Sequence, residues 1–162
     1  MSPAKILATQ IDARICARTT GFARKVRVGL KRSHTRSMTK YLMVGIGGAL
    51  GSILRFWVSG YVGDQLGARF PYGTFIVNCT GSFLIGFFVT ILAQRTHWSP
   101  NWRYLIPIGF IGGYTTFSAF ELEVFRSFQE GEFLVAGLNV VLSVVVGFAS
   151  VWLGVIAGRT IS

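Results

Sequence analysis

Four long apolar segments divide this chain, and they restrict its possible folds more than any other feature. They cover about residues 41–62, 72–94, 104–128 and 133–158, and each has at least 22 residues. At 1.5 Å per residue, a helix of that length crosses the roughly 30 Å hydrocarbon core of a bilayer. A soluble helical protein would need polar faces, which these segments lack. The sequence therefore predicts an all-α integral membrane protein with four transmembrane helices.

The positive charge of the chain is concentrated near its N-terminus. The net charge is +10, yet residues 1–37 hold nine of the 16 basic residues and only one acid, Asp12. This segment thus carries +8 and residues 38–162 carry +2. A charge confined to one tail argues against a nucleic-acid-binding protein. We predict a basic N-terminal tail over 1–37, disordered or untranslated, and a four-helix membrane domain over 38–162.

The third apolar segment contains a run that suits a helix poorly. Residues 112–120 read Gly-Gly-Tyr-Thr-Thr-Phe-Ser-Ala-Phe, with two adjacent glycines and two adjacent threonines. Both residue types have low helix propensity. Within a bilayer, irregular backbone is tolerated only where it is buried in protein or lines a polar cavity. We therefore expect the third helix to be broken in its middle. The alternative is a flexible helix with a packing glycine pair.

The first apolar segment contains one charged side chain, Arg55, which shares a helix face with Gly47 and Gly51. Glycines at this spacing permit close contact between helices. A guanidinium at this depth is costly unless it finds acceptors or extends to the membrane surface. Two interpretations of Arg55 stay open: an interior or vestibule residue, or a side chain that reaches the interface.

Small and polar residues recur every four positions on the second and fourth segments. These stripes are Thr74, Asn78, Ser82 and Gly86, and then Asn139, Ser143 and Gly147. Such stripes either hydrogen-bond neighbouring helices or line a polar path, and equal spacing over several turns favours the path. We expect no helix to carry a buried carboxylate near its middle, and this absence argues against a proton-coupled pump.

Three motifs occur in order on the first three segments. They are Gly47-Gly48-Ala49-x-Gly51-x-x-x-Arg55, Pro71-x-Gly73-Thr74-x-x-x-Asn78-x-x-Gly81-Ser82-Phe83, and Gly109-x-x-Gly112-Gly113-x-Thr115-Thr116-Phe117-Ser118. Together they resemble the small fluoride channels of the Fluc or CrcB family, over about residues 38–158. The resemblance implies a multi-pass protein of the plasma membrane, in bacteria the inner membrane. Its implied partners are fluoride, membrane lipid and a second copy of the chain.

The resemblance also implies roles for individual residues. Channels of this family are antiparallel, dual-topology homodimers with two fluoride pores and a structural sodium ion at the centre. Gly112 and Thr115 match the positions whose backbone carbonyls hold the sodium, and Arg55 matches a vestibule residue. The predicted fluoride path comprises Asn78, Ser82, Phe117, Ser118, Phe120 and Ser143. Two residues depart from the family pattern: Ala119 replaces a usual threonine, and Asn139 stands where tyrosine or another polar residue is expected.

The chemistry of these residues agrees with a channel for a small, strongly hydrated anion. Amide and hydroxyl groups can replace the water that fluoride loses, and phenyl edges carry partial positive charge. No nucleophile–base pair is visible, so we predict no enzyme activity. The resemblance implies passive export of toxic fluoride from the cytoplasm. Two alternatives stay open. A small dual-topology multidrug exporter would need a glutamate in its first helix, and a non-conducting scaffold would use the glycines for packing alone.

The tail also bears on how the chain inserts into the membrane. From Met38 onward the side of both termini has four basic residues and the opposite side has two, with Arg55 left out as membrane-embedded. These are Lys40, Arg95, Arg103 and Arg159 against Arg69 and Arg126. So weak a bias permits insertion in both directions, whereas the tail raises the count to 13 against two. We therefore expect translation to begin at Met38, or the tail to be removed or disordered.

Overall fold

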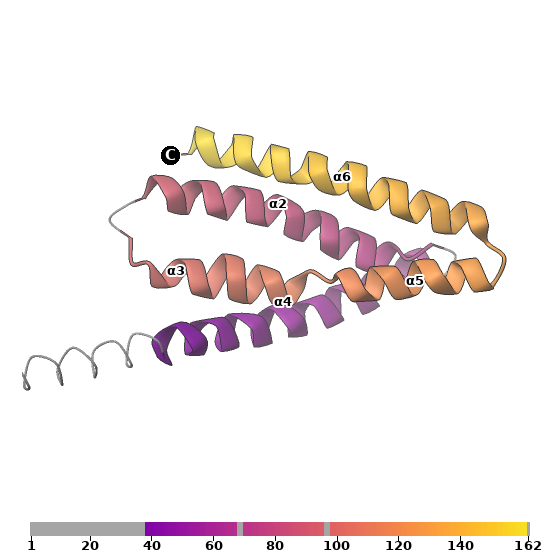
Figure 1. Ribbon diagram of the computed structural model, residues 1–162, viewed down its shortest axis with the longest axis horizontal. Coiled ribbons are helices and arrows are strands. Elements are labelled where there is room, and N and C mark those ends of the chain that lie inside the picture. The colour runs from indigo at the N-terminus through magenta and orange to yellow at the C-terminus, as the bar shows by residue number, and fades with distance from the viewer. Residues whose placement is uncertain (1–37, 68–69, 96–97, 162) are drawn as a thin grey trace, which may run out of the picture. The chain divides into compact units, whose positions relative to one another are not determined.

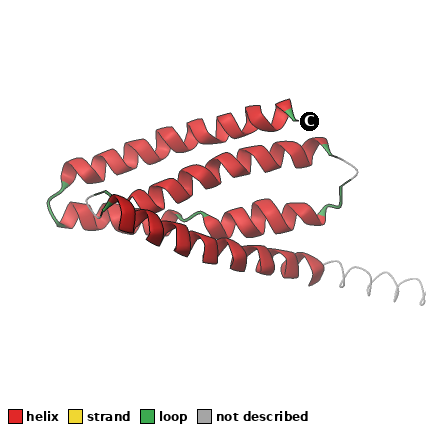
Figure 2. Ribbon diagram, turned by 180° about the vertical axis from the view of Figure 1, so that it is seen from behind, coloured by secondary structure: helices red, strands yellow, loops and turns green. Residues whose placement is uncertain are grey.

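The computed structural model describes residues 38–67, 70–95 and 98–161, and the tail predicted over 1–37 lies outside these ranges. Every regular element in them is helical and none is a strand (Figures 1 and 2). The elements are a first helix Met38–Leu66, α2 Tyr72–Gln94, α3 Asn101–Arg103, the π-helix η1 Tyr104–Ile111, α4 Gly112–Tyr114, α5 Phe117–Gln129 and α6 Phe133–Thr160.

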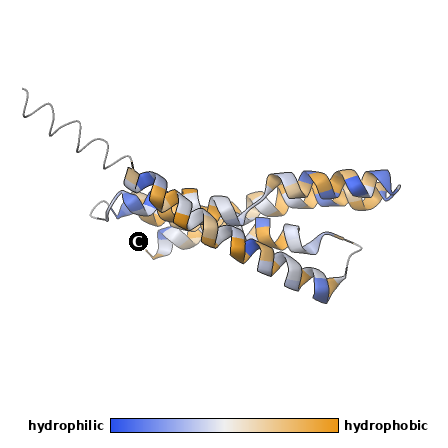
Figure 3. Cartoon of the chain, turned by 90° about the horizontal axis from the view of Figure 1, so that it is seen from below, coloured by the Kyte–Doolittle hydropathy of each residue, from blue (hydrophilic) through white to orange (hydrophobic). Residues whose placement is uncertain are grey.

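Three of these helices are long and apolar enough to cross a membrane: Met38–Leu66, α2 and α6. Hydrophobic residues cover most of their length, and hydrophilic residues gather towards the helix ends (Figure 3). Most large apolar side chains on them are exposed in the single chain, as expected for a surface that faces lipid or a partner. By length and composition, these helices fit a chain that crosses a membrane more than once.

The third predicted segment is broken, so it is not among the helices long enough to cross a membrane. The α4 helix ends at Tyr114, and Thr115 and Thr116 take extended conformations with ψ values of 155° and 120°. The hydroxyl of Thr116 then caps α5 by accepting a 3.2 Å hydrogen bond from the amide of Ala119. The predicted break is confirmed, and it appears as a short loop between the two helical halves in Figure 2.

Glycines hold the first helix against the first half of the broken segment. A Cβ on Gly47 would lie 2.7 Å from the amide nitrogen of Phe110, and one on Gly113 would lie 2.5 Å from the carbonyl oxygen of Gly48. A Cβ on Gly51 would collide with the carbonyl oxygen of Phe110. Only glycine permits so close an approach of two backbones.

The α2 and α6 helices lie side by side along most of their length (Figure 1). Their contact also depends on glycine, because a Cβ on Gly86 would collide with the carbonyl oxygen of Val151. On the facing helix, a Cβ on Gly154 would collide with the carbonyl oxygen of Phe83. The broken segment contacts this pair through α2 near its break and through α6 along α5.

Candidate functional site

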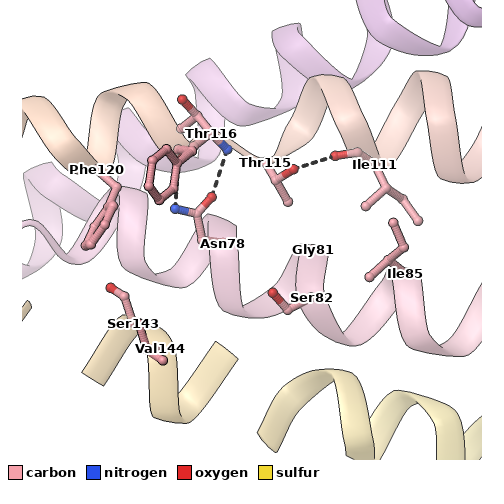
Figure 4. Close-up of a pocket in the computed structure, with 11 residues that line it drawn as sticks. Asn78, Gly81, Ser82, Ile85, Ile111, Thr115, Thr116, Phe120, Ser143 and Val144 are labelled. Atoms are coloured by element: carbon pink, nitrogen blue, oxygen red, sulfur yellow. Dashed lines mark hydrogen bonds between the residues drawn. The ribbon is translucent and has the colours of Figure 1, made fainter. Parts of the chain in front are cut away.

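A cavity of about 360 Å³ lies where α2, the broken segment and α6 meet (Figure 4). Its walls are Asn78, Gly81, Ser82 and Ile85 of α2, Ile111, Thr115, Thr116, Phe117 and Phe120 of the broken segment, and Ser143 and Val144 of α6. Five of the six residues predicted to form the fluoride path therefore line one cavity. The walls combine amide, hydroxyl and phenyl groups, and no lining residue carries a charge.

Asn78 connects α2 to the break through two hydrogen bonds. Its Nδ2 donates to the carbonyl oxygen of Thr116 at 2.9 Å, and its Oδ1 accepts from the amide of Thr116 at 2.8 Å (Figure 4). The side chain thus pairs with extended backbone as a neighbouring strand would. A carboxamide has two N–H donors and two acceptor lone pairs, so one donor and one lone pair remain for another ligand.

Phe117 and Phe120 stand next to each other on the first turn of α5. Their ring centroids are 5.7 Å apart and their planes are inclined by 47°. Phe120 is 8% exposed, whereas Phe117 is 72% exposed in the single chain. Tilted rings present edges as well as faces, and ring edges are the electropositive part of an aromatic side chain.

The opposite wall of the cavity carries Ser143, whose hydroxyl donates to Oδ1 of Asn139 at 3.2 Å. Asn139 is only 2% exposed and does not line the cavity. It lies one turn before Ser143 on α6, so it orients the Ser143 hydroxyl from behind. A buried amide that directs a neighbouring hydroxyl gives this departure from the family pattern a structural role.

Among the predicted path and vestibule residues, Ser118 and Arg55 lie outside the cavity. Ser118 is exposed, with its hydroxyl 3.4 Å from that of Thr116. Arg55 is partly buried on the first helix, and its Nε has no hydrogen-bond partner in the described part of the chain. Neither residue belongs to the cavity walls in the single chain.

The residues of the polar stripe predicted on α2 have different neighbours in the structure. Asn78 and Ser82 line the cavity, Thr74 hydrogen-bonds to α5, and Gly86 packs against the backbone of α6. Part of the stripe therefore acts as contact between helices, as the alternative interpretation proposed. Equal spacing placed these residues on one face, but it did not decide which of them meets a cavity.

Comparison with known proteins identifies the family. Residues 42–155 match the family model described as CrcB-like protein, Camphor Resistance. The chain belongs to this CrcB-like family. A relative from Acidobacterium capsulatum named fluoride-specific ion channel FluC is 49% identical over 122 residues, which is 75% of this chain and 98% of the relative. Relatives of the same name from Geotalea daltonii and Solibacter usitatus are 47% and 43% identical, over 76% and 74% of this chain and 100% and 98% of theirs.

Membership of the CrcB-like family confirms the resemblance seen in the sequence. The named relatives are ion channels and not enzymes. The three long apolar helices fit a multi-pass protein of a bacterial inner membrane.

Glu123 is a residue of this CrcB-like chain whose environment the sequence did not reveal. It lies at the centre of α5, half-buried, and its Oε1 accepts a 2.5 Å hydrogen bond from the Thr74 hydroxyl. Its Oε2 is buried without a hydrogen-bond partner among the described residues. Glu123 is central in the short helix α5 but lies near the end of the predicted segment 104–128, so the expectation that no membrane helix carries a buried carboxylate near its middle stays a prediction.

The backbone carbonyls of Gly112 and Thr115 fit the role of cation ligands. Neither oxygen receives a hydrogen bond from any part of the chain that the structure describes. Gly112 is exposed at the surface of the single chain, and a Cβ there would meet nothing closer than 3.8 Å. Backbone carbonyl oxygens are suitable ligands for a hard cation. The donor set present therefore matches the predicted sodium site in chemical type.

Proposed function

We propose that this chain forms a fluoride-selective channel through which fluoride leaves the cytoplasm passively. The cavity that joins Asn78, Ser82, Phe117, Phe120 and Ser143 carries the proposal. A dehydrated fluoride ion needs donors that replace its water, and the serine hydroxyls and the remaining Asn78 N–H supply them. The phenyl edges attract the anion without a full charge, which lets it leave again. The names of the relatives support fluoride as the ion.

The functional unit in this proposal is an antiparallel homodimer with two pores. The 72% exposure of Phe117 supports it, because a pore-lining ring needs a second wall that the single chain does not provide. Gly112 is exposed on the same broken segment, where a second copy can approach its backbone closely. Arg55 would then stand near a vestibule and raise the local concentration of anions.

Sodium belongs to this proposal as a structural ion between the two copies. The freed carbonyls of Gly112 and Thr115 would hold it. A bound cation would satisfy acceptors that the broken helix leaves without donors, and it would add a fixed positive charge beside an anion path. We propose that it stays in place during transport.

One observation favours the multidrug exporter as a second candidate. Glu123 is a half-buried carboxylate, and such groups serve proton coupling in membrane transporters. However, it lies on α5, whereas the exporter interpretation requires a glutamate in the first helix, where Arg55 is the charged residue of the apolar segment. Passive fluoride flux without proton coupling would separate the channel from the exporter.

The test is fluoride efflux from liposomes that contain the purified protein, followed with a fluoride electrode. We expect Phe117→Ile and Asn78→Ala to abolish or strongly reduce efflux while the dimer still assembles. Phe148→Ile is the matched control, because Phe148 is 76% exposed on α6 and lies outside the cavity. Wild-type efflux in both cavity variants, or equal loss in the control, would refute the path. No efflux from the wild-type protein would leave the scaffold as the explanation.

A further inference from the structure

In the broken segment, regular helical hydrogen bonding stops just before the carbonyl of Gly112. The amide of Thr115 still donates to the carbonyl oxygen of Ile111 at 2.9 Å, as in a helix. The next amide, that of Thr116, would donate to Gly112 if the helix continued. It donates instead to Oδ1 of Asn78 at 2.8 Å. The Gly112 carbonyl is therefore free because a side chain of α2 has taken its donor.

The Thr115 carbonyl is free for a similar reason. In a continuous helix it would accept from the amide of Ala119, four residues later. That amide donates to the hydroxyl of Thr116 at 3.2 Å, in the cap of α5. Two side-chain acceptors, Asn78 Oδ1 and Thr116 Oγ1, thus withhold the two amides that would otherwise occupy Gly112 and Thr115.

The amide group of Asn78 suits this task better than other side chains of its size. The Thr116 carbonyl would accept from the amide of Phe120 in a regular helix, and it receives Nδ2 of Asn78 at 2.9 Å instead. Asn78 therefore satisfies a backbone donor and a backbone acceptor of the same residue. A hydroxyl is too short to bridge both groups, and an aliphatic side chain offers neither.

We propose that Asn78 is the positioning residue of the cation site, as well as part of the cavity wall. By holding the amide of Thr116, it keeps the Gly112 carbonyl available to sodium. Without it, the acceptor that a continuous helix offers to that amide is the Gly112 carbonyl, and closing this helical bond would remove one ligand. This inference rests on the proposed sodium ion. It makes one side chain of α2 necessary for both the anion path and the cation site.

Packing around the break supports a fixed geometry at this point. A Cβ on Gly81, one turn after Asn78 on α2, would collide with Cγ2 of Thr115. The Thr115 hydroxyl is engaged as well, because it donates to the carbonyl oxygen of Ile111 at 3.0 Å. Close packing on one side and the Asn78 bridge on the other leave the extended backbone little freedom to move away from α2.

The test compares how sodium stabilises the purified protein in four variants. The thermal midpoint is measured against sodium concentration, with choline as the replacing cation. Asn78→Ala and the volume-matched Asn78→Leu remove the acceptor for Thr116, and we expect them to need at least about tenfold more sodium for half of the stabilisation. Asn78→Asp keeps an acceptor for the Thr116 amide but loses the donor to the Thr116 carbonyl, so its sodium requirement should rise less than in Asn78→Ala, although its charge opposes fluoride.

Ser82→Ala is the matched control, because Ser82 lines the same cavity on the same helix and makes no side-chain hydrogen bond to the break within the described ranges. It should keep the sodium dependence of the wild type while its fluoride efflux falls. This inference alone would be overturned if Asn78→Ala or Asn78→Leu, whichever assembles, kept the sodium dependence of the wild type. It would also be overturned if Asn78→Asp and Ser82→Ala needed as much extra sodium as Asn78→Ala does. A wild-type protein that sodium does not stabilise would refute the sodium part of the proposed function and this inference with it, whereas the efflux assay tests the channel separately.

Discussion

The contact between Gly113 and Gly48 gives a prediction whose size follows from backbone geometry. Gly113 lies in α4, just before the break, and faces the first helix. In Gly113→Ala the new Cβ would lie 2.5 Å from the carbonyl oxygen of Gly48 and 2.9 Å from its Cα. Both are backbone atoms, so no change of rotamer can relieve the contact. The first helix and the broken segment would have to separate.

The required displacement sets the expected cost. The backbones must part by about 0.5 Å to bring this Cβ–oxygen distance to 3.0 Å, and by about 0.9 Å for an ordinary contact of 3.4 Å. Overpacking of this kind in a well-packed interior costs about 1–3 kcal/mol. Replacing glycine by alanine within a helix returns up to about 1 kcal/mol through helix propensity.

Gly45→Ala is the matched control, because Gly45 lies on the same first helix and a Cβ there would meet nothing within 4 Å. Both variants gain a similar helix propensity, so their difference isolates the contact. We expect Gly113→Ala to be less stable than Gly45→Ala by about 1–3 kcal/mol, measured by SDS-induced unfolding with tryptophan fluorescence. Equal stability of Gly113→Ala and Gly45→Ala would refute the reasoning.

Three further predictions concern the elements around the cavity. Thr74→Val removes the hydroxyl that donates to Glu123 and should lower the free energy of unfolding by about 1–3 kcal/mol; an unchanged SDS midpoint would contradict this. Thr115→Ser keeps both the backbone carbonyl and the bond to Ile111, so liposome efflux should stay near wild type, and a loss of about tenfold would count against carbonyl coordination. Gly154→Ala should separate α2 from α6 and lower the thermal midpoint, whereas Gly137→Ala on the same helix, with open space around it, should not.

Hydropathy and helix propensity predicted most of the fold. The second segment matches α2 over 72–94, and the fourth ends only two residues before α6 does. The first helix runs over Met38–Leu66, beyond the predicted 41–62, because polar residues at a membrane surface extend a helix without being apolar. The π-helix η1 was not predicted. It contains Pro107, which lacks an amide N–H for a regular helical bond and was the one local signal for an irregular helix there.

The site was predictable to the extent that it depends on one face of one helix. The four-residue spacing placed Asn78 and Ser82 together, and the motif placed Phe117 and Phe120 on one turn. Glu123 was missed because its burial depends on Thr74, 49 residues away. A pattern within a helix states which residues share a face, but the residues opposite that face come from elsewhere in the chain.

Asn78 illustrates why the two interpretations of a polar stripe need not exclude each other. Its Oδ1 and one N–H bind Thr116, 38 residues away, which is contact between helices in the ordinary sense. Its remaining N–H belongs to a side chain in the cavity wall, as a lined path requires. An amide is the smallest neutral side chain that offers two donors and two lone pairs. A chain that must break a helix inside a membrane and present a donor beside the break can therefore meet both needs with one residue.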